Sequence, residues 1–187
     1  MKVSPQVKEQ YPSNYLDSPL PAHIAQFAFP EGYALSSTEE SPVFFSFVLT
    51  NTLGTKMYAC ALTFYEVLDP LDIVQMVAGP PSQWLDETKT IYAPKCLLVL
   101  SHHPYFSASR LFLQQVYRLS LSSSPVPIER YIANFACEVP LPPPGQVQVQ
   151  LTLPDRTLTI ARPPVNQLPL INVSHVGPWI DGMMPDG

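Results

Sequence analysis

Two adjacent histidines, His102 and His103, are the residues of this chain best suited by type to acid–base chemistry or metal binding. Adjacent side chains point to opposite sides of an extended chain and diverge by about 100° on a helix, so they rarely chelate one ion. A third ligand would have to come from His23, His175 or scattered acids, and no spacing supports that. Pro104 follows and biases His103 away from helical dihedral angles. The sequence therefore favours a structural corner, where a strand passes into a helix.

Other candidate nucleophiles and charged pairs also fit structural roles. The chain has no G-x-S-x-G motif, and its serine run, residues 122–124, lies at a predicted helix end, where hydroxyl groups ordinarily cap and turn the backbone. The sequence "NTLGTK" has a single glycine and is too short to be a phosphate-binding loop. The acidic pairs Glu39-Glu40 and Asp86-Glu87 are typical of solvated loops. We therefore predict no catalytic residue.

The three cysteines, Cys60, Cys96 and Cys137, lack the short spacing of a metal-binding knuckle. Cysteine packs as a small hydrophobic residue when it is not used as a ligand. We expect buried free thiols in a cytosolic protein, with no metal site and no cofactor-binding residue.

Charge and hydropathy restrict the partners of the chain. The net charge is −5, without a cluster of Lys or Arg, which argues against nucleic acid and against a polybasic membrane anchor. No stretch approaches the roughly 18 apolar residues of a membrane span, and the N-terminus lacks the apolar region of a signal peptide. Only 13% of the residues are charged, which suggests that another domain or partner normally covers part of the surface. We expect a soluble, cytoplasmic protein.

Proline marks the connections, with 23 prolines against 7 glycines. Residues 1–42 are predicted to be irregular, with a short strand or extended piece at Ala25–Phe29 and a turn at residues 30–32. From Val43 onward, two runs rich in aromatic and β-branched residues flank the hairpin-length loop Asn51–Thr55. Both faces of the second run are apolar, which is typical of a central strand covered on both sides.

A third strand and two helices are predicted next. Residues 67–91 read as a long connection with a short helix at Leu71–Val77, and Lys95–Ser101 reads as a buried strand. A helix with Ser107 as its N-cap should run from Ala108 to Leu121. Its wide apolar arc suggests a position between two layers. The arc is formed by Phe112, Leu113, Val116 and Leu119, with Tyr117 at its margin. The opposite, polar side is formed by Arg110, Gln114, Gln115 and Arg118.

The last part of the chain should hold a second helix and a hairpin. Pro127 suits a first helical position, and a narrow apolar stripe follows, formed by Ile128, Ile132, Phe135, Ala136 and Val139. Residues 140–145, "PLPPPG", are predicted to be a stiff linker. Alternating residues from Val147 to Leu153 and the run "TLTIA" then form a hairpin with one wet face. Trp179 in the tail either docks on a neighbouring domain or packs back on this chain.

Several ordered motifs resemble the N-terminal part of DENN-domain proteins. The matching sequences are the phenylalanine-rich hairpin that ends in "TFYE", the segment "PKCLLVLSHHPYF" leading into a helix, and "VPLPPPG" before an alternating strand. "QYPSNYLDSPLP" and "FPEG" also match, so the resemblance covers about residues 8–175.

The resemblance implies an α/β fold of α+β type: a longin-like lobe with a mostly antiparallel sheet flanked by helices, and a C-terminal β-hairpin leading into a further lobe. It implies four segments: an irregular N-terminal part, 1–42; the upstream (uDENN) lobe, 43–139; the linker, 140–145; and the start of the central DENN section, 146–187. The first strand usual in the family, which resembles "YFVVVGL", and the rest of the central section are expected to lie outside this chain.

The implied function is that of a guanine-nucleotide exchange factor for a Rab-family small GTPase in membrane trafficking. The implied partners are the GTPase and the remaining DENN lobe, and the implied location is cytoplasmic or peripheral on trafficking membranes. The family supplies no short motif from which GTPase contacts can be assigned to residues here. Two alternatives stay open: a non-catalytic longin-like interaction module or short isoform, and a small hydrolase that uses His102 or His103.

Overall fold

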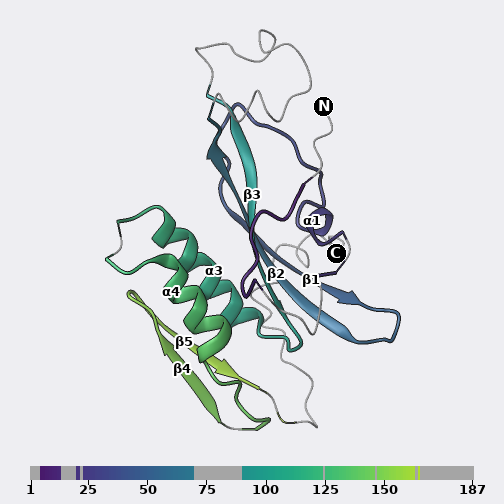
Figure 1. The fold of residues 1–187 in the computed structure, drawn as a ribbon, viewed down its shortest axis with the longest axis vertical. Coiled ribbons are helices and arrows are strands. Elements are labelled where there is room, and N and C mark those ends of the chain that lie inside the picture. Colours follow the sequence, from purple (N-terminus) through teal and green to yellow (C-terminus); the bar gives the residue numbers. More distant parts are fainter. Residues whose placement is uncertain are drawn as a thin grey trace, which may run out of the picture.

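The fold is of α+β type and places one long helix between two antiparallel sheets (Figure 1). The computed structural model describes residues 5–13, 20–21, 23–69, 90–123, 125–145, 147–162 and 164. The elements in chain order are α1 (Ile24–Phe27), β1 (Val43–Thr50), β2 (Lys56–Val67), β3 (Tyr92–Ser101), α3 (Phe106–Ser120), α4 (Ile128–Ala133), η2 (Asn134–Glu138), β4 (Gln148–Thr152) and β5 (Thr157–Ala161). The predicted helix at residues 71–77, the pair Asp86-Glu87, His175 and Trp179 lie outside the described residues.

The larger sheet is an antiparallel meander with the order β1-β2-β3. The loop between β1 and β2 is closed by the Asn51 side chain, whose Oδ1 accepts hydrogen bonds from the backbone N–H groups of Leu53 and Thr55 at 3.0 and 2.8 Å. Gly54 has a φ of 80°, a left-handed conformation that glycine adopts without a steric penalty. The predicted hairpin is therefore confirmed.

Strand β2 is central and is buried on both faces, as its sequence predicts. On one face, Cys60 and Leu62 pack against Leu113 of α3. On the other face, Ala59 and Ala61 have no exposed surface. The small side chains on that face allow other parts of the chain to approach the sheet closely.

Helix α3 begins earlier than the sequence indicates. Tyr105 rather than Ser107 is the N-cap, and it makes no side-chain capping bond. The Tyr105 carbonyl accepts a hydrogen bond from the Ser109 N–H at 2.9 Å. Phe106 lies in the first turn, where its ring packs edge-on against Tyr58 of β2. Tertiary packing of an aromatic residue thus accompanies the early start of the helix.

The position of α3 between two layers is confirmed. Phe112 and Val116 share one hydrophobic cluster with Leu97 and Val99 of β3 on one side and with Leu158 of β5 on the other. The predicted polar side of α3 is wrong at one position, because Gln115 is only 1% exposed. Its amide Nε2 donates to the carboxylate of Asp155, in the turn of the β4–β5 hairpin, at 3.2 Å. The hairpin covers the helix on the side that the sequence alone leaves open to water.

The second helix changes its winding partway along. Pro127 is the N-cap of α4 and not its first helical residue, and after Ala133 the chain continues as the π-helical segment η2. The N–H of Val139 bonds to the carbonyl of Asn134 at 3.0 Å, five residues earlier. This wider turn leaves Ala136 exposed, against the prediction of a regular stripe, while Phe135 stacks on Phe112 at a centroid distance of 3.9 Å.

The C-terminal hairpin has the predicted strands, and its inward-facing residues Leu158 and Ile160 are buried. The proline-rich stretch before it is docked and not free. Pro142 is fully buried, and the N–H of Gly145 bonds to the carbonyl of Arg162 at 3.1 Å. The described residues 147–162 therefore share a core with segment 43–139 through α3; the boundary between the two predicted segments stays a prediction.

The N-terminal part contains a short helix where a strand or extended piece was predicted. Ile24 and Ala28, four residues apart, are both buried, which is the spacing of one helical face. The predicted turn follows, with the N–H of Gly32 bonded to the carbonyl of Phe29 at 3.0 Å. A single helical turn is too short for its period to be recognised in the sequence.

Candidate functional site

The histidine pair lies at the corner between β3 and α3, as predicted. The hydroxyl of Ser101 accepts a hydrogen bond from the His103 N–H at 3.1 Å, and the His103 carbonyl accepts one from the Tyr105 N–H at 2.9 Å. The His103 ring packs edge-on against the ring of Tyr105, whereas His102 is exposed. The backbone is fixed by these local bonds, and the two side chains do not converge on one ligand.

Burial and neighbouring charges favour the neutral form of His103. Partial burial lowers its pKa below the ordinary value of 6.5, and the positive charges of Arg162 and His102 lower it further. Arg162 follows β5 and also lies near the Tyr105 hydroxyl. The corner therefore receives a cation from the second sheet, and the charges that act on His103 from the described residues are the positive ones of Arg162 and His102, which make it a weaker base.

The three thiols differ in exposure. Burial raises the pKa of Cys60 to about 11 and that of Cys96 to about 12. Cys137 is exposed on η2. The prediction of three free thiols is confirmed, but only Cys60 is fully buried, since Cys96 is half-buried and Cys137 is exposed. On the helical projection that predicts the apolar stripe, Cys137 lies opposite Ile128, so its exposure agrees with the stripe and not with the prediction of a buried thiol.

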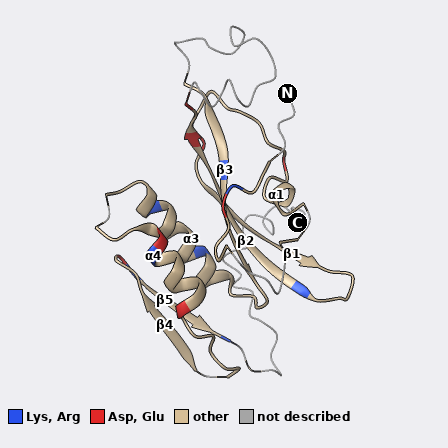
Figure 2. Ribbon diagram, in the orientation of Figure 1, with Lys and Arg blue, Asp and Glu red and all other residues tan. Residues whose placement is uncertain are grey.

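The described residues do not form a metal centre or a cationic face. Among them, no three His, Cys, Asp or Glu side chains gather closely enough to hold an ion. Figure 2 shows Lys and Arg scattered singly over the described elements. Within the same part of the chain, no helix has both the length and the apolar character that a membrane crossing requires.

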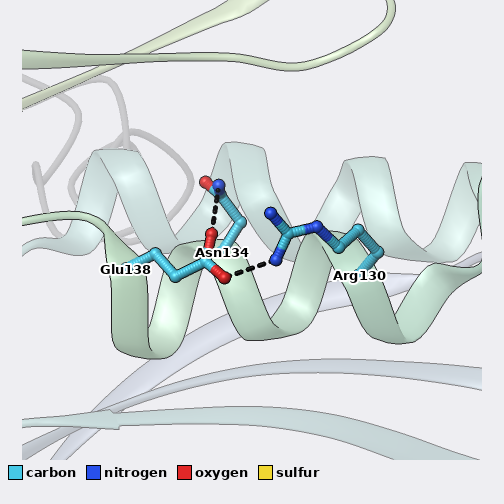
Figure 3. Close-up of polar contacts among 3 residues, drawn as sticks. All are labelled: Arg130, Asn134 and Glu138. Carbon is cyan, nitrogen blue, oxygen red and sulfur yellow. Dashed lines mark hydrogen bonds and ion pairs between the residues drawn. The ribbon is translucent and has the colours of Figure 1, made fainter.

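One candidate binding surface is polar and lies on α4 and η2 (Figure 3). Arg130 donates to one oxygen of the Glu138 carboxylate, and the amide of Asn134 donates to the other oxygen at 3.0 Å. These bonds lower the pKa of Glu138. Tyr11 lies beside Cys137 and Glu138, so the N-terminal segment crosses onto this helix.

A second candidate binding surface is aromatic and lies on the α1 side of the larger sheet. The rings of Phe45 and Phe47 stack along β1 at 6.0 Å, and Phe27 of α1 stacks on Phe47 at 5.9 Å. Phe27 is 49% exposed. We call these three residues the aromatic row. Because α1 is only four residues long, it covers this face of the sheet incompletely.

The charged groups singled out in the sequence serve as packing contacts. The guanidinium of Arg110 lies over the ring of Phe44 at 5.2 Å, a cation–π geometry. Burial is the largest cause of the raised pKa of Tyr65. Glu40, which accepts a hydrogen bond from the Tyr65 hydroxyl, raises that pKa further. The carboxylate of Glu31 also contributes to that rise, to a smaller extent.

Sequence reasoning missed the Arg130–Asn134–Glu138 network and the Gln115–Asp155 bond. The first has a readable signal, since residues four apart lie on one helical face. The second has none, because it depends on how the hairpin docks on α3.

Comparison with known proteins places two successive family models on the chain. The uDENN domain model matches residues 5–64, and the DENN (AEX-3) domain model matches residues 92–179. The two matches occur in the order that the sequence motifs predict. They include the larger sheet, α3 and the hairpin.

A curated relative carries the same kind of domain. It is a DENN domain and WD repeat-containing protein of Arabidopsis thaliana, 30% identical over 145 residues. The alignment covers 76% of this chain but 12% of the relative, so the chain spans about one eighth of that protein's length. No solved structure matches the chain.

Proposed function

The chain belongs to the DENN-domain family, and from this premise we propose that it forms part of a guanine-nucleotide exchange factor for a Rab-family small GTPase. The observation that carries the proposal is the ordered pair of uDENN and DENN matches, because exchange on Rab GTPases is the general activity of this family. The proposed location is the cytoplasm or the periphery of trafficking membranes.

Exchange of this kind needs a binding surface and no covalent chemistry. A protein that binds the GTPase best with its switch regions displaced weakens nucleotide and magnesium binding. Because coupling is reciprocal, bound nucleotide weakens binding of the exchange factor by the same factor. Each tenfold weakening of nucleotide affinity requires about 1.4 kcal/mol of differential binding. A histidine pair held apart at a backbone corner is compatible with this mechanism.

We expect exchange to require the complete DENN module. In the family, the upstream and central lobes share the GTPase-binding surface, and this chain spans 12% of its relative. The second lobe would bring contacts that neither the polar network nor the aromatic row supplies alone. We therefore propose that the remaining lobe is the second partner of this chain.

The experiment measures release of a fluorescent guanine nucleotide from a panel of Rab GTPases. The 187-residue chain and the complete DENN-containing protein are added in parallel, with EDTA as the positive control for release. The complete protein should accelerate release from at least one Rab by more than tenfold, and the chain alone should act weakly. Absence of acceleration by the complete protein on every Rab would contradict the exchange-factor proposal.

A binding module without exchange activity is the second candidate function. The aromatic row favours it, since Phe27 exposes about half of its surface beside Phe47. Pull-down of a Rab without faster nucleotide release by the complete protein would support this candidate over the first. Phe27→Ala should then weaken binding, while Leu53→Ala, in the exposed β1–β2 loop, should not.

A further inference from the structure

The outer edge of β1 is unpaired among the described residues. The order β1-β2-β3 leaves β1 at one side of the sheet. The N–H of Asn51 bonds to Thr55 across the hairpin, and antiparallel pairs alternate along a ladder. The odd-numbered residues of β1 therefore bond to β2. The even-numbered residues Phe44, Ser46, Val48 and Thr50 direct their N–H and C=O groups outward.

The sequence of this edge is unusual for an exposed one. Natural edge strands are generally protected from pairing by a charge, a proline or a bulge. The eight residues of β1, "VFFSFVLT", contain no charge and no proline, and they pair with β2 without a bulge. Val43 and Val48 are 58% and 48% exposed. This is an open template for one more strand.

The opposite edge of the sheet is better protected. Tyr92, the first residue of β3, exchanges both backbone hydrogen bonds with Ser36. Pro94 has no N–H, and Lys95 places a charge on the strand. The contrast identifies β1 as the edge at which added pairing meets the least opposition.

The residues of β1 are complementary to a second copy of themselves. We propose that β1 pairs antiparallel with β1 of a second copy of this chain, with Ser46 opposite Ser46 at the twofold axis. In this register each of the outward-directed pairs, 46 with 46 and 44 with 48, exchanges both of its hydrogen bonds. The two small hydroxyl side chains meet on the α3 face, flanked by Phe44 opposite Val48. The two three-stranded sheets become one continuous sheet.

The opposite face and the strand ends fit the same register. Phe45 of one copy lies opposite Phe47 of the other, so the stacked pair within each strand extends into a ladder of four rings. At the ends, the acidic pair Glu39-Glu40 before β1 approaches the hairpin end of the other copy, which carries Lys56. A strand from a different protein would form the same backbone hydrogen bonds, but its side chains would not in general complement those of β1 on both faces of the sheet. The proposal does not depend on exchange activity.

The test combines sedimentation with a charge placed at the axis. The 187-residue chain should sediment as a dimer that dissociates on dilution, and Ser46→Lys should reduce dimer affinity by at least tenfold because two like charges would meet. Leu121→Lys adds the same charge at an exposed residue beyond the end of α3, away from β1, and should leave the dimer intact. At a concentration at which wild type and variants are all monomeric, both variants should keep the wild-type melting temperature within about 2 °C, because both positions are exposed.

A cysteine at the axis tests the register. Paired Cα atoms at a hydrogen-bonded position lie about 5.5 Å apart, within the range of a disulfide. In a Cys137→Ser background, Ser46→Cys should form a cross-linked dimer at least tenfold faster than Leu53→Cys.

Three results would overturn the proposal. One is a wild-type chain that stays monomeric at about 100 µM. The open edge of β1 would then be better explained as a site for a strand of a different protein. Another is a dimer that survives Ser46→Lys. The third is equal cross-linking at positions 46 and 53. Failure here would leave the nucleotide-release experiment unaffected, so the two proposals can fall separately.

Discussion

At the scale of single residues, the positions of the two histidines decide their role more than their residue type does. His102 and His103 are adjacent in sequence, but one is exposed and the other packs on Tyr105. The sequence predicts this corner from Pro104 and from the divergence of adjacent side chains. It does not predict the approach of Arg162, which comes from a hairpin about sixty residues later.

The lowered pKa of His103 predicts a pH-dependent stability. The folded state binds the proton more weakly than the unfolded state, so this contribution is complete above about pH 6.5 and is lost as the pH falls through the lowered pKa. The melting temperature should therefore fall between pH 7 and pH 5, and His103→Gln should make that fall smaller. His102→Gln, at the exposed neighbour, should keep most of the wild-type fall. Identical pH profiles for wild type and His103→Gln would show that the corner does not sense protonation.

Thiol reactivity should separate the three cysteines. At pH 8 an aromatic disulfide reagent should modify Cys137 quickly, because it is exposed, whereas burial raises the pKa of Cys60 and Cys96 to about 11 and about 12. The colour change should correspond to one fast thiol per chain, with the other two reacting only after denaturant is added. Cys137→Ser should abolish the fast phase. Two or more fast thiols in the native protein would contradict the burial of the sheet residues.

At the scale of elements, helix α3 shows how much a pattern can predict. Its apolar arc predicts burial on two sides, and Phe112, Leu113, Val116 and Leu119 are all buried. The position of Gln115 could not be predicted, because helical periodicity assigns it to water and only the docked hairpin removes it from water. The π-helical turn of η2 likewise depends on packing, since intrinsic propensity gives no signal for it.

The Gln115–Asp155 bond can be measured by a double-mutant cycle. Asp155→Ala should cost about 1 kcal/mol in the free energy of unfolding, because it leaves the buried Gln115 amide without its acceptor. Gln115→Met keeps the volume and removes the amide, so Asp155→Ala should then cost close to nothing. Urea unfolding of the four proteins gives the coupling directly. Additive costs would mean that the bond does not hold the hairpin on α3.

At the scale of the whole molecule, helix α3 joins the two sheets, because it packs against β2 and β3 of one sheet and β5 of the other. Phe112 contacts Phe135 of η2 and belongs to the cluster that includes Leu97 of β3 and Leu158 of β5. The sequence predicts the strands, the helices and the α+β class. It predicts only that α3 lies between two layers. It does not predict which strands form each layer, because this follows from contacts between residues distant in the chain.

Removing the Phe112 ring should weaken both layers together. Phe112→Ala should lower the free energy of unfolding by about 3 to 5 kcal/mol, as expected for a large buried aromatic residue. Far-ultraviolet circular dichroism and the exposure of Cys60 should report the same midpoint in urea. Leu121→Ala, at a residue 70% exposed beyond the end of α3, should change stability by less than about 0.5 kcal/mol. Separate midpoints for the two probes would show that the layers unfold independently.

The central place of α3 also sets an order of events during translation. The strands β1 and β2 are complete at residue 67, but the helix that covers them ends at residue 120 and the hairpin that covers the helix ends at residue 161. About 40 residues separate the end of α3 from the end of the hairpin. Because synthesis adds roughly 5–20 residues per second, the hairpin is complete roughly 2–8 seconds after α3. The nascent chain therefore presents an apolar helix and an open strand edge for seconds. Chaperone capture in that interval should matter more for the yield of this protein than the stability of its finished fold.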